Sequence, residues 1–268
     1  MTQTPEQTQS IATPAVLVDL DVVKRNIARF QTYANQIGMA VRPHIKTHKL
    51  PQVALMQLKA GAVGITCQKI SEAEAMVAAD DRLNDVLITY NILGAEKLAH
   101  LRDLAGKVRL TVVADNAVVI DGLAAAFEDA PTPLRVLVEL DPGLRRSGVS
   151  PGHAVAIARA AADAGLEVHG AFTFGGHGYS SCDAPAGAGD DEVRTLTQAA
   201  ELLRAAKWVR TPEPRDSPNE GSLRFRWEQA DCLFNINAEA LLGTDAEQRV
   251  NDKLRVPAGQ TRYQMFVM

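Results

Sequence analysis

Short apolar runs rich in β-branched residues recur along the first 174 residues, and stretches with helical periodicity separate them. The runs are 15–20, 39–45, 62–67, 85–90, 108–114, 134–140 and 168–174. A strand that is apolar on both faces is buried on both faces, and its alternation with helices is typical of parallel βαβ units with right-handed crossovers. The alternation therefore predicts an α/β fold built on a parallel sheet.

The first interval shows the helical pattern clearly, because its apolar positions fall at helical spacing. Asp21 is the predicted N-cap of this helix, and Gly38 is the predicted stop. The apolar positions between them are Val23, Ile27, Phe30 and Ile37.

Two architectures compete for such a pattern, an open doubly wound sheet and a closed (β/α)8 barrel of the TIM type. No GxGxxG follows the first run, which leaves the dinucleotide-binding version of the open sheet without support. Polar side chains recur directly after successive runs, at the end of the strand where barrels carry their reactive groups. They are Lys46, Gln68, Asn91, Asp115, Asn116, Asp141, His177 and Tyr179. This recurrence favours the barrel.

Charge and composition exclude several classes of partner. The formal net charge of -4, without a long basic run, argues against a general nucleic-acid binder. No apolar stretch approaches the ~20 residues that a membrane span needs, and the polar N-terminus does not read as a secretory signal. The three cysteines are Cys67, Cys182 and Cys232; they form no CxxC pair and are typical of free thiols in a reducing compartment. We therefore expect a cytoplasmic protein that binds neither nucleic acid nor membranes.

The regular pattern ends near residue 206. The stretch that follows carries three prolines and mixed charge, so 207–268 is predicted to be a divergent and poorly ordered segment. Within it, "DCLFNINAEALLG" fits one more strand and a helix, whereas the tail "RVPAGQTRYQMFVM" has no predicted element. We expect a disordered N-terminus at 1–12 and an α/β barrel at 13–206.

The segment "RPHIKTHK", from Arg42 to Lys49, packs basic groups around a proline at the end of a buried run. Neighbouring positive charge and partial desolvation both favour the neutral amine of Lys46, the form that attacks a carbonyl to make a Schiff base. A solvated basic loop or a phosphate-attracting patch is the alternative. His44 and His48 have i, i+4 spacing, but the segment follows a strand and a proline, so orienting or packing roles are favoured over a metal pair.

Two further loops follow the sixth and seventh runs. "DPGLRRSGV" presents Arg145 and Arg146, either as surface arginines or as guanidinium groups aimed at an oxyanion, a phenolate or a carboxylate. "TFGGHGYSS" places His177 and Tyr179 between glycines that allow close approach of a ligand, and these two side chains are a plausible acid/base pair.

Six segments, taken together, resemble the D-threonine aldolase and eukaryotic-type D-serine dehydratase group of fold-type III pyridoxal phosphate (PLP) enzymes. The resemblance runs from about Thr13 to Ser181 in unbroken order, and "RPHxKTHK" is its most specific motif. The segments are "TPAVLVDLD", "RPHIKTHK", "GITCQKISEAE", "LITYNILG", "DPGLRRSGV" and "GGHGYS". The resemblance implies a barrel of the alanine racemase N-terminal type. It assigns run 15–20 to a second, β-rich domain, so six barrel strands remain visible.

The resemblance also implies roles for individual residues. Lys46 would form the Schiff base with PLP, and Arg146 would contact the ring hydroxyl of the cofactor. Tyr179 would lie beside the Schiff base, with His177 near it, and Gln68 would line the cofactor site.

Two features of the family are not recognisable here. Its "GGST"-like loop and "PGTYVFND"-like strand hold the PLP phosphate, and neither is found in good form, so the barrel is expected to be incomplete. The family's divalent metal is bound by a His-x-Cys type site in a C-terminal β-domain, but no histidine follows His177. That domain is therefore expected to be largely missing, no metal ligand is assigned, and His177 is the candidate substitute base.

The resemblance implies a PLP-dependent carbon–carbon lyase of the D-threonine aldolase type. Such an enzyme cleaves a D-3-hydroxy amino acid to glycine and an aldehyde. Dehydratase or racemase activity on the same skeleton is one alternative, and a catalytically inactive PLP-binding or remnant barrel is another. The expected partner is a small D-amino acid. Fold-type III relatives are often dimers, so the resemblance implies a homodimer.

Overall fold

The computed structural model describes residues 11–181, 183–206, 232–235 and 263–266. Within these residues, parallel strands form one eight-stranded sheet in the order β1-β8-β7-β6-β5-β4-β3-β2. The strands are β1 (Ala40–Val41), β2 (Ile65–Cys67), β3 (Asp85–Ile88), β4 (Arg109–Ala114), β5 (Arg135–Leu140), β6 (Glu167–Thr173), β7 (Cys232–Asn235) and β8 (Tyr263–Phe266).

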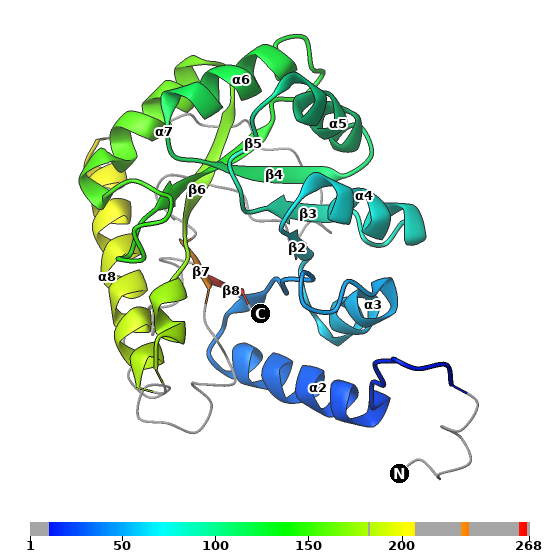
Figure 1. The fold of residues 1–268 in the computed structure, drawn as a ribbon. Helices are drawn as coiled ribbons and strands as arrows, with labels where there is room; N and C mark the ends of the chain where they lie inside the picture. Colours follow the sequence, from blue (N-terminus) through cyan, green and yellow to red (C-terminus); the bar gives the residue numbers. More distant parts are fainter. Residues whose placement is uncertain (1–10, 182, 207–231, 236–262, 267–268) are drawn as a thin grey trace.

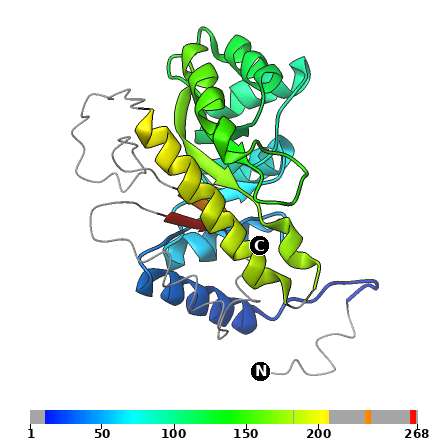
Figure 2. The ribbon, with the colours of Figure 1, turned by 90° about the vertical axis from the view of Figure 1, so that its left-hand side faces the viewer.

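Helices surround the strands in chain order, from α2 through α5 to α8 (Figure 1). They are α2 (Leu20–Gln36), α3 (Pro51–Ala60), α4 (Ile70–Ala79), α5 (Ala95–Ala105), α6 (Ala117–Phe127), α7 (Ala154–Asp163) and α8 (Ala184–Ala205), with the 3-10 turns η1 (Pro151–His153) and η2 (Gly176–Tyr179). The long helix α8 runs along one side of the molecule (Figure 2). No helix in the part of the chain that is described has the length and apolar character needed to cross a bilayer.

The sheet closes into a barrel just after β1. The amide of Ile45 donates to the carbonyl of Thr66 (2.9 Å), and the amide of Thr66 donates to the carbonyl of Pro43 (2.7 Å). These two hydrogen bonds make an isolated parallel bridge between His44 and Thr66, which joins the two ends of the strand order. The predicted parallel (β/α)8 barrel is confirmed.

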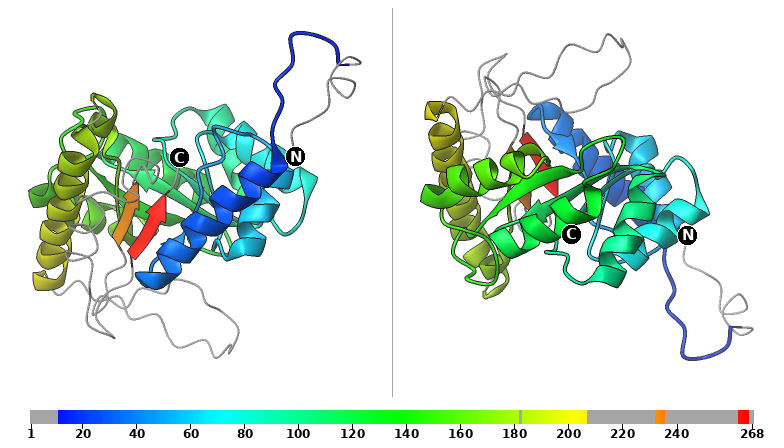
Figure 3. Two further views of the ribbon diagram at one scale, coloured as in Figure 1. Left: turned by 90° about the horizontal axis from the view of Figure 1, so that it is seen from below. Right: turned by 90° about the horizontal axis from the view of Figure 1, so that it is seen from above.

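The strands β7 and β8 add to the six barrel strands that the sequence pattern identifies. Seen from below, they lie between α8 and α2 (Figure 3, left), and β8 pairs with β1. The strand predicted within "DCLFNINAEALLG" is confirmed as β7. The tail without a predicted element contributes β8. The helix expected after β7, most of segment 207–268 and the N-terminal residues 1–10 lie outside the described residues.

Run 15–20 differs from its prediction. Residues 15–19 form no strand in the described structure, and Leu20 already begins α2. The carboxylate of Asp19 accepts hydrogen bonds from the amides of Asp21 and Val22, so Asp19 rather than Asp21 is the N-cap. No neighbouring strand among the described residues covers the apolar side chains of this run, and Val16 is 92% exposed. The predicted stop is correct, because Gly38 adopts a positive φ of 71° directly beyond the helix.

The barrel strands bury both of their faces. Outward side chains such as Val112, Val136 and Val138 belong to the large core between the sheet and the helices. Inward side chains form a smaller cluster inside the barrel, of Leu87, Val113, Leu137 and Phe172, with Phe174 packed against it. Because each face is apolar, these strands show the near-continuous hydrophobic runs that the sequence displays.

Candidate active site

A pocket opens inside the barrel at the carboxyl ends of its strands. Its position is the place where the (β/α) barrel fold carries reactive side chains. The residues that line it are His44, Lys46, Thr66, Thr89, Tyr90, Arg146, Phe172 and Phe174. Two of the residues predicted from the sequence, Lys46 and Arg146, are thus brought together from distant segments of the chain.

The basic segment 42–49 does not form a single patch, because its side chains point to different places. Arg42 turns to the opposite end of the barrel, where its guanidinium is buried and lies 2.9 Å from Asp85. Arg109 contacts the other carboxylate oxygen of Asp85 at 2.9 Å. The backbone of Gly64 makes room for Arg42, since a Cβ there would lie 2.2 Å from Nη1 of Arg42.

The two histidines of the segment are engaged locally. His44 is buried in the barrel seam, and its Nδ1 accepts a hydrogen bond from the amide of Lys46 (3.3 Å). Nδ1 of His48 accepts a hydrogen bond from the amide of Leu50 (3.0 Å). Burial lowers the pKa of His44 to about 3, with a smaller contribution from the charge of Lys46, so His44 is neutral at physiological pH. The described residues contain no group of three or more metal-binding side chains.

Lys46 is half-buried at the wall of the pocket. Its Nζ lies 5.6 Å from the centroid of the Phe174 ring. Burial is the main cause that lowers the pKa of Lys46, the positive charge of Arg146 lowers it further, and the carboxylate of Glu72 opposes both. The surroundings therefore shift Lys46 toward its neutral amine, which is the direction that the sequence analysis predicts.

Arg146 lies between two aromatic rings. Its guanidinium carbon is 4.6 Å from the centroid of Phe174 and 5.2 Å from that of Tyr90, and Nη1 is 3.4 Å from the Tyr90 hydroxyl. Guanidinium groups stack on aromatic faces in this way. Arg145 instead lies in the turn that follows Asp141, where it adopts a left-handed φ of 58°.

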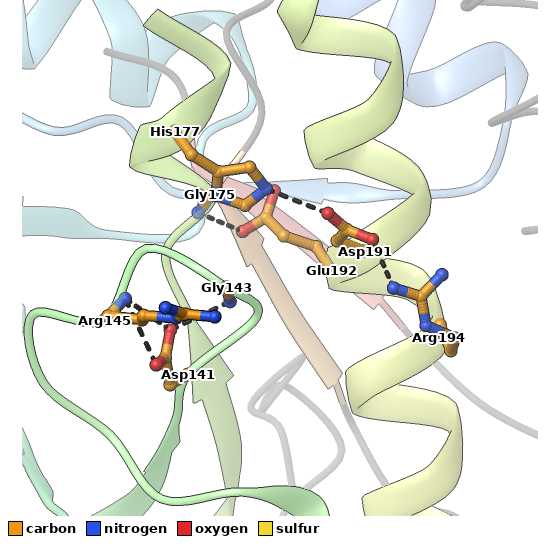
Figure 4. A network of polar contacts seen from close by, with 8 residues as sticks. All are labelled: Asp141, Gly143, Arg145, Gly175, His177, Asp191, Glu192 and Arg194. Carbon is orange, nitrogen blue, oxygen red and sulfur yellow. Dashed lines mark hydrogen bonds and ion pairs between the residues drawn. The ribbon is translucent and has the colours of Figure 1, made fainter. Parts of the chain in front are cut away.

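Carboxylates hold the loop that carries Arg146 at both ends. Asp141 accepts hydrogen bonds from the amides of Gly143 (2.8 Å) and Arg145 (3.0 Å) (Figure 4). Asp115 accepts one from the amide of Gly148 (2.7 Å). Such contacts fix the backbone on either side of the arginine, so the loop that carries Arg146 has little backbone freedom to lose on binding.

Glu139 is a buried carboxylate beneath this loop that sequence reasoning missed. It is 2% exposed and accepts a hydrogen bond from the Ser147 hydroxyl (2.7 Å). Burial raises the pKa of Glu139 to about 7. The effect of burial is larger than the opposite effect of the hydrogen bond from Ser147, which lowers the pKa. The only available signal was its place one residue before the end of the strand run.

Gln68 does not line the pocket. Its backbone amide donates to the Glu72 carboxylate (3.0 Å), and it is the preceding inward residue, Thr66, that faces the pocket. The Thr66 hydroxyl is fully buried and has no hydrogen-bond partner among the described residues. Alternation along β2 is the sequence signal that could have identified Thr66, because successive side chains on a strand point to opposite faces.

His177 and Tyr179, on η2, also stay outside the pocket lining. Nε2 of His177 pairs with Asp191 of α8 at 3.1 Å, and Asp191 in turn pairs with Arg194 (Figure 4). Nδ1 of His177 is buried without a hydrogen-bond partner in the described chain. Tyr179 reaches the edge of the site through Phe174, with ring centroids 6.4 Å apart, and burial raises its pKa.

The turn at Gly175 requires the small residue that stands there. Its amide donates to the buried carboxylate of Glu192 (2.8 Å), and a Cβ would lie 2.8 Å from that side chain. This contact ties the start of η2 to α8. The glycine-rich loop predicted from the sequence is therefore a closely packed connection at this position.

A parallel barrel with a partly desolvated lysine and an arginine at its C-terminal mouth is chemically suited to hold a carbonyl compound that carries negative charge. The particular family follows from comparison with known proteins. The chain matches the alanine racemase N-terminal domain family over residues 18–219, and it belongs to that family. Fold-type III enzymes with this barrel use PLP.

Individual relatives agree with this family. The chain is 41% identical to the D-threonine aldolase of Arthrobacter sp. over 140 residues, which are 52% of this chain and 36% of that protein. It is 34% identical to the D-threo-3-hydroxyaspartate dehydratase of Delftia sp. (strain HT23) over 208 residues, 74% of this chain and 53% of the relative. The chain thus spans about a third to a half of the length of these curated relatives.

A solved structure shows the same architecture. The crystal structure of D-threonine aldolase from Filomicrobium marinum superposes with a TM-score of 0.69 at 28% identity. The superposition covers 96% of this chain and 62% of that one. These comparisons confirm both the predicted family and the predicted type of barrel. The boundaries at residues 12 and 206 stay predictions.

Proposed function

We propose that this chain is the barrel of a PLP-dependent lyase that acts on D-3-hydroxy amino acids, of the D-threonine aldolase type. The observation that carries the proposal is the position of Lys46. Its amine is half-buried at the mouth of the barrel, where burial and the charge of Arg146 both lower its pKa. A neutral lysine amine in such a place is suited to condense with an aldehyde.

The pocket residues fit PLP. Lys46 offers an amine for the aldehyde, and Arg146 offers a cation for a phenolate oxygen. The Tyr90 and Phe174 rings supply apolar surface for a flat heterocycle. The buried Thr66 hydroxyl has no partner in the described structure, so a ligand atom in the pocket would satisfy it.

The mechanism assigns a task to each side chain. When bound, PLP supplies an electron sink for the bonds at the substrate Cα. Lys46 would hold the cofactor through its Nζ, and Arg146 would orient the ring, while its charge opposes protonation of Lys46. The rings of Tyr90 and Phe174 contact the guanidinium of Arg146 and help to hold it at the pocket.

We propose His177 as the base that takes a proton from the substrate β-hydroxyl, with Nδ1 as the acceptor. Asp191 supports this role, because a carboxylate on Nε2 orients an imidazole and stabilises its protonated form. Movement of η2 toward the pocket is part of this proposal, since His177 stays outside the lining. We assign Tyr179 to the wall beside Phe174.

A dehydratase is the second candidate. Of the two curated sequence relatives described above, the one that aligns over more of this chain is the D-threo-3-hydroxyaspartate dehydratase, at 74% against 52%. A dehydratase would release a keto acid from the same substrates, whereas an aldolase would release glycine and an aldehyde. Assays for both products with D-threonine and D-3-hydroxyaspartate separate the two activities.

The primary test is borohydride reduction of the protein with PLP, followed by peptide mass mapping. We expect one reduced pyridoxyl group, on the peptide that contains Lys46, and an imine absorbance band that is lost in Lys46→Ala. Lys59→Ala, at the end of α3, is the matched control and should keep the band. Modification spread over surface lysines, and equal in Lys46→Ala, would overturn the proposal.

The remaining expectations concern the whole protein. We propose a small D-amino acid as the ligand, a homodimer as the assembly and the cytoplasm as the compartment. Sedimentation velocity tests the assembly directly. A species with the mass of one chain at micromolar concentration would contradict the dimer.

A further inference from the structure

Lys49 is the member of the basic segment that the proposed function leaves without a task. It lies three residues after Lys46 and adopts a left-handed backbone conformation with φ of 51°. A residue with a Cβ rarely adopts this conformation unless its surroundings impose it. The amide of Lys49 donates to the carbonyl of Ile45 (2.8 Å), which tightens the loop that carries Lys46.

The side chain of Lys49 reaches a buried carboxylate. Its Nζ lies 3.0 Å from Oε1 of Glu72, in the first turn of α4, and the Glu72 side chain is 7% exposed. The other oxygen, Oε2, accepts a hydrogen bond from the amide of Gln68 (3.0 Å). Oε1 accepts no regular hydrogen bond within the described residues, so its charge is balanced by the ion pair with Lys49.

The charge of Glu72 matters for Lys46. Among the groups around Lys46, Glu72 raises the pKa, whereas burial and Arg146 lower it. An uncompensated buried carboxylate favours the charged form of an amine that its field reaches. The charged or titratable groups facing this pair from every packed element are Arg146 from the loop after β5, His44 from the loop after β1, Cys67 from β2 and Lys49 itself.

We propose that Lys49 is a positioning residue that neutralises Glu72 and so keeps the Lys46 amine uncharged and reactive. The inference deepens the proposed function, because it concerns the amine on which that function rests. It assigns the two lysines of "KTHK" different tasks. Lys46 lines the pocket, while Lys49 pairs with the nearby carboxylate that would favour the ammonium form of Lys46.

The test measures Lys46 without any cofactor. Trace labelling with acetic anhydride over a pH series, followed by peptide mass mapping, reports the fraction of Lys46 that is uncharged. We expect Lys49→Met to lower the labelling of Lys46 at pH 8 by roughly threefold, because an uncompensated opposite charge favours the ammonium form. Lys49→Arg keeps the charge and should label like wild type.

The double variant Lys49→Met, Glu72→Gln decides between a charge effect and a packing effect. Removal of both charges should restore the labelling of Lys46 to the wild-type level, whereas a loss of packing would persist. Lys97→Met, on the exposed surface of α5, has the same net charge change and should leave Lys46 unaffected. Far-UV circular dichroism confirms that each variant is folded.

Two outcomes overturn the inference. One is wild-type labelling in Lys49→Met, and the other is a double variant that labels no better than Lys49→Met. Because this readout needs no PLP, it is separable from the proposed function. If Lys46 labelling follows the expected pattern but no imine forms with PLP, the proposed function fails and the role of Lys49 stands.

Discussion

Arg146 and Phe174 form the contact on which the site is organised: the guanidinium carbon lies 4.6 Å from the centroid of the ring. Nζ of Lys46 lies 5.6 Å from the same centroid. The negative face of the ring attracts both cations and so holds two like charges close together. Their mutual repulsion favours loss of the proton from Lys46.

The first prediction concerns Arg146. We expect Arg146→Gln to raise the pH at which Lys46 forms an imine with PLP, because the nearby positive charge that lowers the pKa of Lys46 is lost. We also expect the affinity for PLP to fall about tenfold, the typical loss for one charge-assisted hydrogen bond. An absorbance titration of the imine between pH 6 and pH 10 measures both effects.

Arg146→Lys is the matched control for this experiment. It keeps the charge but loses the planar contact with Tyr90 and Phe174. The midpoint of imine formation should stay near that of wild type, while the affinity for PLP falls. Equal midpoints in Arg146→Gln and wild type would show that the arginine does not tune the amine.

The second prediction concerns His44, whose pKa of about 3 in the folded protein lies below its ordinary 6.5, mainly through burial. As pH falls below 6.5 the unfolded chain takes up a proton and the folded protein does not, so stability is lost. The loss attributable to His44 between pH 7 and pH 5 is about 2 kcal/mol. Urea unfolding of wild type and His44→Gln at both values measures it as a difference.

His153→Gln, at an exposed position in η1, serves as the control and should show the same pH dependence as wild type. His44→Gln should lose less stability than wild type on going from pH 7 to pH 5. A parallel decline in both proteins would mean that His44 is protonated in the fold.

The third prediction concerns Glu139, whose contribution to stability changes with pH in the opposite direction to that of His44. Burial raises its pKa to about 7, so above its ordinary value of 4.5 the unfolded chain releases a proton that the folded protein retains. This contribution destabilises the fold as pH rises from 4.5 to 7. Relative to wild type, Glu139→Gln should gain about 2 kcal/mol of unfolding free energy between pH 5 and pH 8. Urea unfolding at the two pH values tests this.

The amide of Glu139→Gln can still accept the hydrogen bond from Ser147, so packing beneath the Arg146 loop is preserved. Glu201→Gln, exposed on α8, is the matched control. If Glu139→Gln and wild type respond identically to pH, then Glu139 is ionised in the folded protein and its environment is more polar than its burial indicates.

The fourth prediction concerns the floor of the barrel. A Cβ at Gly64 would lie 2.2 Å from Nη1 of Arg42 and 2.6 Å from the carbonyl oxygen of Asp85. Gly64→Ala should therefore displace the buried ion pair and cost about 2–3 kcal/mol of unfolding free energy. Chemical denaturation measures the loss. Gly187→Ala, in α8, should be neutral or stabilising by up to about 1 kcal/mol, because a Cβ there would meet no described atom within 4 Å.

Buried strands could be predicted from the sequence because their side chains face apolar layers on both sides. The run 134–140 became β5 (Arg135–Leu140) and the run 108–114 became β4 (Arg109–Ala114). The run 15–20 has the same local composition but forms no strand within the described residues, because a strand also needs a neighbour to pair with. Local pattern does not contain that information.

Only the features of the site that depend on residue type and on the position of strand ends could be predicted from the sequence. Lys46 and Arg146 follow their strands directly and meet in the pocket. His177 does not, because Asp191 of α8, which lies further along the chain, binds its Nε2. Gln68 was predicted to line the cofactor site, whereas Thr66, two residues earlier, is a residue of this segment that lines the pocket. Side-chain direction in a loop depends on such distant partners, so sequence spacing cannot supply it.

The bridge between His44 and Thr66 joins the first and last members of the strand order, and Lys46 lies two residues beyond it. The peptide groups that close the barrel are therefore also the ones that hold Lys46 in place. A fluctuation that breaks this bridge would move the Lys46 amine away from Phe174 while the surrounding helices are still folded. The reactivity of the Lys46 amine should accordingly be lost under milder denaturing conditions than the helical structure.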